Sequence, residues 1–134
     1  MVCILKKFSD EKQPGLNVKR INGIEVSDEE LLRYYSFELE KVGGDSKGQW
    51  VNSISMILSE HKIYTKSFSR ETFFTSRVSS VINPGEPLSS IQIDPYTGVY
   101  RSEIPLDTRL KSQSDSVKKM ADFLIEVLDI SYGT

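Results

Sequence analysis

The most informative pattern of apolar and polar positions lies in the middle of the chain, along His61–Arg70. In an extended strand, side chains point to opposite faces with a period of two, so the even positions share one face. That face carries cations interleaved with aromatic rings: Lys62, Tyr64, Lys66, Phe68 and Arg70. The pattern therefore predicts a strand with one cationic and aromatic face.

Nearer the N-terminus, a turn signal separates two short apolar runs. Asn22-Gly23 lies between Leu16–Ile21 and Ile24–Val26. Asn-Gly favours a tight hairpin turn, because both central turn positions adopt a positive φ that these residues tolerate. We therefore predict a short β-hairpin here.

The next segment has the signals of an amphipathic helix. Ser27 and Glu30 are spaced as a capping box, in which the serine hydroxyl accepts a hydrogen bond from the amide three residues later. Gly43-Gly44 provides the stop, because glycine tolerates the left-handed backbone that ends helices. We predict a helix over Asp28–Val42. Its apolar stripe consists of Leu31, Leu32, Tyr35, Leu39 and Val42.

Two further segments favour helices by the spacing of their apolar residues. After a capping signal at Ser46, helical spacing continues to about Glu60 through Trp50, Val51, Ile54, Ile57 and Leu58. The segment Glu71–Ile82 is ambiguous, because Phe74 and Val78 fit one helical face whereas Thr72 and Thr75 favour a strand. We predict a helix in both segments.

The C-terminal part predicts a second hairpin and a last helix. Asp94–Gly98 has the residues of a tight turn, and it lies between apolar runs within Ser90–Ile104. Ser114 then caps a helix expected over Asp115–Ile130. Apolar side chains outside the main stripe of this helix favour contact with a partner, and they are Phe123, Ile125 and Ile130.

Together these elements predict an α+β fold. We expect a single domain over residues 1–134, with a mainly antiparallel sheet, two hairpins and three to four helices packed on it. A chain of 134 residues is long enough to build a core without disulfide or metal cross-links.

Composition narrows the class of protein. Hydrophobic residues make up 38% and charged residues 27%, which is typical of a globular chain. The net charge of −2 argues against a surface that grips nucleic acid everywhere, although it allows a local basic patch. The single cysteine, Cys3, excludes an intramolecular disulfide and favours a reducing compartment. Without an apolar run long enough for a signal peptide or a bilayer span, we expect an intracellular protein that does not insert in a membrane.

The sequence carries no recognisable catalytic motif. His61 is the only histidine, so the HExxH zinc motif and histidine-pair metal sites are excluded. Neither GxSxG nor the phosphate-binding pattern GxxxxGK[ST] occurs, which removes the common hydrolase and nucleotide-binding signatures. We therefore expect a protein that is not an enzyme and binds no metal or cofactor.

Two functions remain. The first is a protein–protein interaction module, such as an adaptor, a chaperone or a regulatory or inhibitory subunit, whose partner is another protein or a second copy of the chain. The alternative is single-stranded nucleic-acid binding, in which aromatic rings stack on bases and cations neutralise phosphates. That site would use Lys62, Tyr64, Lys66, Phe68, Arg70 and Arg77. If Tyr64 and Phe68 instead point into the core, the strand is structural, so their orientation separates the hypotheses.

Overall fold

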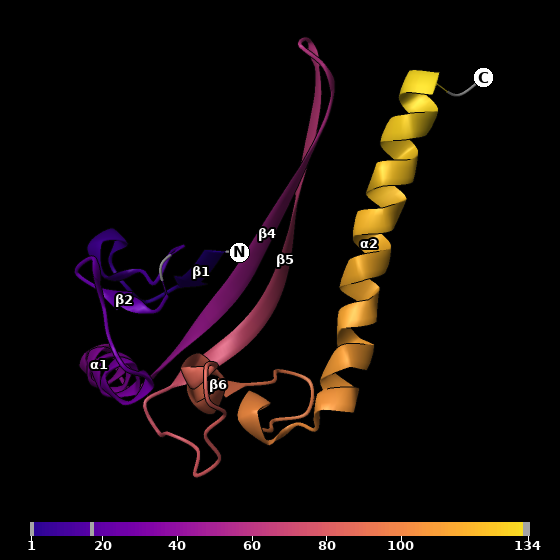
Figure 1. The fold of residues 1–134 in the computed structure, drawn as a ribbon. Coiled ribbons are helices and arrows are strands. Elements are labelled where there is room, and N and C mark those ends of the chain that lie inside the picture. Colours follow the sequence, from indigo (N-terminus) through magenta and orange to yellow (C-terminus); the bar gives the residue numbers. More distant parts are fainter. Residues whose placement is uncertain (1, 17, 133–134) are drawn as a thin grey trace. The chain divides into compact units, whose positions relative to one another are not determined.

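The computed structural model describes residues 2–16 and 18–132 and has an α+β fold with a curled antiparallel sheet. Its four-stranded sheet has the order β1-β4-β5-β6, and a separate two-stranded ribbon pairs β2 with β3. The six strands are β1 (Val2–Leu5), β2 (Arg20–Ile21), β3 (Ile24–Glu25), β4 (Asp45–Ser59), β5 (Lys62–Thr75) and β6 (Gln92–Ile93). Figure 1 shows β4 and β5 running together as one long hairpin to a tight turn.

The described residues form two α-helices, α1 (Asp28–Lys41) and α2 (Leu106–Tyr132), rather than the three to four helices that we predicted. Three short 3-10 helices, η1 (Asp10–Lys12), η2 (Pro87–Ile91) and η3 (Arg101–Glu103), lie in the connections. Grouped by their contacts, the residues form two compact units. Unit 1 comprises Met1–Val51 and Ser69–Ile104, and unit 2 comprises Asn52–Phe68 and Pro105–Thr134. The interpretation of residues 1–134 as one domain stays a prediction.

The local signals near the N-terminus are confirmed. β2 and β3 pair across Asn22-Gly23, both of which have positive φ values, of 50° and 79°. The Ser27 hydroxyl accepts a hydrogen bond of 3.2 Å from the Glu30 amide at the start of α1. The helix ends where the sequence predicts, and the Gly44 amide closes it by donating to the Leu39 carbonyl at 2.8 Å.

The helix predicted between Ser46 and Glu60 is wrong, because this segment is strand β4. Its even-numbered side chains, including those of Trp50, Ile54 and Met56, are less exposed than its odd-numbered ones over most of the strand. Ile57 belonged to the predicted helical stripe, yet its side chain is 70% exposed. β5 pairs along one side of β4 and β1 pairs with Gly48–Val51 on the other side, and this tertiary pairing overrides the helical spacing.

The predicted helix over Glu71–Ile82 is also wrong. β5 continues through this segment to Thr75, and an irregular connection follows it. The strand alternation buries Thr72 and Phe74 and leaves Phe73 between them partly exposed. The strand predicted at His61–Arg70 is confirmed but is longer than expected.

The two C-terminal predictions need smaller corrections. The Asp94–Gly98 turn forms, with Gly98 at a φ of 72°. Only a single bridge between Ile93 and Tyr100 follows it, because the chain then enters η3 instead of a second strand. The last helix begins at Leu106, so Ser114 lies inside it and does not cap it.

The core of unit 1 lies between α1, the inner ends of the long strands and the segment around η2. Its buried apolar side chains are Cys3, Leu5, Phe8, Leu31, Leu32, Tyr35, Leu39, Phe74, Leu88 and Ile91. Gly48 makes room for the Phe74 ring, because a Cβ at this position would lie 2.6 Å from one ring carbon and 2.7 Å from another. Residue 48 must therefore remain glycine for this ring to pack as it does.

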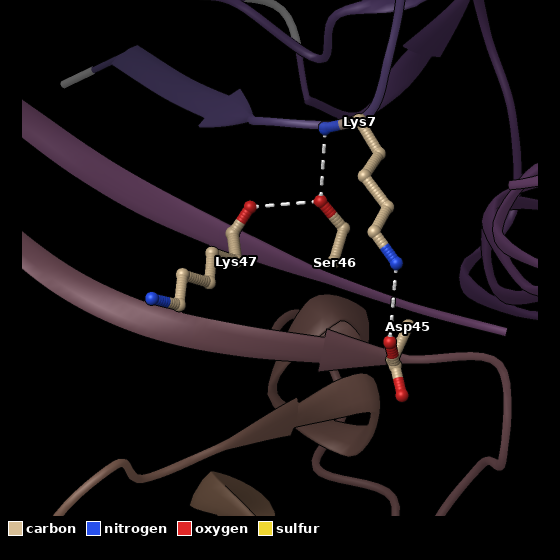
Figure 2. A network of polar contacts seen from close by, with 4 residues as sticks. All are labelled: Lys7, Asp45, Ser46 and Lys47. Atoms are coloured by element: carbon tan, nitrogen blue, oxygen red, sulfur yellow. Dashed lines mark hydrogen bonds and ion pairs between the residues drawn. The ribbon is translucent and has the colours of Figure 1, made fainter. Parts of the chain in front are cut away.

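Polar contacts join the end of β1 to the start of β4. The Lys7 amide donates to the Ser46 hydroxyl at 3.1 Å, and that hydroxyl donates to the Lys47 carbonyl at 2.8 Å (Figure 2). Lys7 also reaches Asp45 at 3.4 Å, but both side chains are exposed, so this ion pair contributes little. Buried Ser46 therefore holds the two strand ends together, and this fixes the register in which β1 runs along β4.

Candidate functional site

The outer part of the β4–β5 hairpin, Asn52–Phe68, has two distinct faces. The Ser53 and Ser67 hydroxyls lie 2.7 Å apart, and those of Ser55 and Thr65 lie 2.8 Å apart, so these residues face each other across the two strands. All four side chains are exposed. The same register places Ile57 opposite Ile63, and both of these side chains are exposed as well. This face of the hairpin is therefore uncharged and open.

The opposite face holds the cationic and aromatic side chains that the sequence singled out. Lys62 and Lys66 are exposed, whereas Tyr64 and Phe68 are half-buried. The Lys66 ammonium group lies 5.6 Å from the centre of the Phe68 ring, within the range of a cation–π contact. The aromatic rings are thus neither core residues nor a freely exposed stacking platform.

Arg70 and Arg77 belong to unit 1 and not to unit 2, which holds the four residues above. The pKa of the Arg70 guanidinium is lowered by partial desolvation, and nearby Asp94 acts in the opposite direction. Arg77 lies beyond the end of β5, where its carbonyl accepts a 2.6 Å hydrogen bond from the Tyr100 hydroxyl. Arg77 therefore does not continue the alternation of the strand.

On α2, the three residues proposed as a partner surface separate into two environments. Phe123 is buried, together with Val127 one turn later. Ile125 and Ile130 are 57% and 62% exposed. Phe123 is therefore covered, whereas the two isoleucines are accessible.

The exposed isoleucines line an open surface depression of about 440 Å³. Its remaining lining residues are acidic, and they are Asp122, Glu126 and Asp129. The sequence analysis did not include these carboxylates, although their spacing of four and three residues places them on one side of a helix. The depression is thus lined by two apolar and three acidic side chains of α2.

Among the described residues, no three His, Cys, Asp or Glu side chains lie close enough to hold a metal ion. His61 lies in the turn between β4 and β5. Burial raises the pKa of the Cys3 thiol to about 12, so it stays protonated and is a poor nucleophile at neutral pH.

No helix in the described part of the chain combines the length and the hydropathy needed to cross a bilayer. Comparison with protein-family models, with curated proteins and with solved structures finds no match to this chain.

Proposed function

We propose that this protein is a non-enzymatic interaction module, an adaptor, chaperone or regulatory subunit, that binds another protein through α2. The observation that carries the proposal is the exposure of Ile125 and Ile130 in a depression that is otherwise lined by carboxylates. Exposed apolar side chains rimmed by polar ones are typical of protein-binding surfaces.

The chemistry of the depression indicates the chemistry of its partner. None of the ion pairs between described residues uses Asp122, Glu126 or Asp129. A partner with apolar side chains flanked by lysine or arginine would cover the isoleucines and complement these carboxylates. A basic amphipathic helix has this combination of side chains in one compact element.

A pair of designed peptides tests this function. We expect a basic amphipathic helical peptide of leucine and lysine to bind, and a leucine and glutamate peptide of equal length not to bind. Replacing Ile125 and Ile130 with serine should weaken binding by about tenfold or more, because each buried isoleucine contributes roughly 1.5–3 kcal/mol. Fluorescence anisotropy of labelled peptides at two salt concentrations measures both effects.

Val117→Ser is the matched control, because Val117 is also exposed on α2 but does not line the depression. It should change the affinity less than about twofold, which corresponds to less than about 0.4 kcal/mol. Equal binding of both peptides, or equal loss of affinity in Val117→Ser, would contradict the assignment of this surface.

Single-stranded nucleic-acid binding is the second candidate. It is supported by the charge on one face of the hairpin, since Lys62 and Lys66 are exposed and neither takes part in an ion pair with a described residue. The rings of Tyr64 and Phe68 lie on the same face. A base could stack on the exposed part of either ring while the lysines neutralise phosphates.

This alternative predicts that a labelled single-stranded oligonucleotide binds at low salt and dissociates as the salt concentration rises. Tyr64→Ala and Lys66→Glu should each weaken binding by about tenfold, because stacking contributes ~1–3 kcal/mol per base and a phosphate contact is lost. Lys19→Glu makes the same charge change at an exposed lysine of unit 1 and serves as the control. The alternative is excluded if no binding occurs at low salt.

A further inference from the structure

The outer edge of β4 is open beyond the end of β1. β1 pairs with β4 only from Gly48 to Val51, where Val51 lies opposite Val2. No described strand pairs with this edge beyond Val51, because β5 lies on the other side of β4 in the sheet. The rest of β4, from Asn52 to Ser59, thus has one side without a partner strand among the described residues.

Hydrogen bonds near the start of β4 show which of its residues point their backbone groups toward this edge. The Lys6 amide donates to the Lys47 carbonyl, so odd-numbered residues of β4 point their backbone groups toward the β1 side. The Ser76 amide donates to the Gly44 carbonyl, so even-numbered residues point toward β5. The facing hydroxyl pairs keep the same register along the hairpin, which shows that no bulge reverses this order.

The backbone groups of Ser53, Ser55, Ile57 and Ser59 therefore point away from β5. Apart from the β4–β5 ladder, none of these residues forms a backbone hydrogen bond with another described residue. Unpaired N–H and C=O groups in a row are a template for another strand.

The two long strands differ in how they protect their edges. Between Val51 and Ser59, β4 has no charged residue, no proline and no glycine. β5 carries Lys62 and Lys66 along the matching length. Charged side chains, lysine above all, discourage edge pairing, so the β5 edge is protected and the β4 edge is not.

We propose that two copies of this chain associate by pairing their β4 strands edge to edge in antiparallel orientation. A two-fold axis near Met56 would place Ser53 opposite Ser59 of the second copy and Ser55 opposite its Ile57. Because these residues all point their backbone groups outward, each pair can exchange two N–H···O hydrogen bonds.

The distribution of charge favours pairing between two β4 edges over pairing between two β5 edges. Two β4 edges bring uncharged segments together, whereas two β5 edges would oppose lysines, and like charges across a strand pair are destabilising. After β4 pairs with β4, the outer part of each hairpin, Asn52–Phe68, presents only its protected β5 edge to a further strand. The two-fold contact is therefore closed, and it yields a dimer and not a growing fibre.

This inference goes beyond the proposed function, because it uses β4 and not the depression on α2. The two proposals fail independently, since substitutions at Ile125 and Ile130 leave the β4 edge unchanged.

Two substitutions at Ser55 provide the test. Ser55→Pro removes an outward N–H that the β5 ladder does not use, and proline is tolerated on edge strands at such positions. Ser55→Ala removes the same hydroxyl and keeps the N–H. Sedimentation equilibrium over a concentration series measures the dimer Kd, and far-ultraviolet circular dichroism with Trp50 fluorescence verifies folding.

We expect wild type and Ser55→Ala to dimerise with similar Kd, and Ser55→Pro to raise the Kd by at least about tenfold. A second pair of variants tests the same contact without removing a backbone N–H group. Ile57→Lys places two like charges near the two-fold axis and should weaken the dimer similarly, whereas Ile63→Lys on β5 should not.

A wild-type chain that stays monomeric at the highest concentration would overturn the proposal. The same holds if Ser55→Pro dimerises as well as Ser55→Ala, if the two lysine variants behave alike, or if the chain forms open-ended assemblies instead of a dimer.

Discussion

Phe74→Ala is expected to lower the free energy of unfolding by about 3–5 kcal/mol, because it removes a large ring from a packed core and leaves a cavity. The Phe74 side chain is 1% exposed and belongs to the core cluster of unit 1. Its ring fills the space above Gly48, where a Cβ atom could not fit. The surrounding backbone cannot easily collapse into the cavity, since β4 and β5 are paired at this point.

Phe73→Ala is the matched control, because it deletes the same side chain one position earlier on the opposite face of β5. The Phe73 ring is 38% exposed, so its loss should cost much less. Urea unfolding followed by the fluorescence of Trp50, the only tryptophan, measures both variants. The Trp50 indole donates a 2.8 Å hydrogen bond to Gln92 in unit 1 and therefore reports on that unit. Equal destabilisation by both variants would show that the packing of Phe74 is wrongly described.

The second large effect is expected in unit 2. Phe123→Ala should lower the free energy of opening of this unit by about 3–5 kcal/mol, because Phe123 is 7% exposed and is one of its few large buried side chains. Amide hydrogen exchange resolves the effect by segment, since each cooperative unit opens with its own free energy. Amides of Asn52–Phe68 and of α2 should lose protection.

Ile125→Ala is the control for this measurement. Ile125 lies two residues further along the same helix and is more than half exposed, so its truncation should leave exchange nearly unchanged. Equal loss of protection in the two variants would contradict the separation of α2 into a buried side and an exposed side. This control also shows whether substitutions in the depression report on binding and not on folding.

The elements that the sequence predicted correctly depend on contacts between close neighbours in the chain. The turn at Asn22-Gly23 depends on two residues that tolerate positive φ. The start of α1 depends on a hydrogen bond between Ser27 and Glu30, and its end on Gly44 and Leu39. Such contacts span at most five residues, so their signal is contained in a short stretch of sequence.

The elements that the sequence predicted wrongly depend on partners far along the chain. The segment from Asp45 to Ser59 is a strand because β5 pairs with one side of it and β1 pairs with its inner part on the other side. Trp50 bonds to a residue 42 positions away, and Ser76 to a carbonyl 32 positions away. The spacing of apolar residues within one segment does not indicate which distant residues pair with it. Strand preference depends on that tertiary context, so the segment was predicted as a helix.

The properties of the candidate sites also separate into those that follow from the local sequence and those that depend on tertiary structure. The sequence by itself determined that Lys62, Tyr64, Lys66 and Phe68 share one face, because the alternation of a strand requires it. It likewise determined the apolar character of the last helix. Only the tertiary structure decided that the aromatic rings are half-buried, that Phe123 is covered while Ile125 is open, and that the β4 edge lacks a partner. The periodicity of a segment states which side chains point together, whereas their exposure depends on what the rest of the chain places against them.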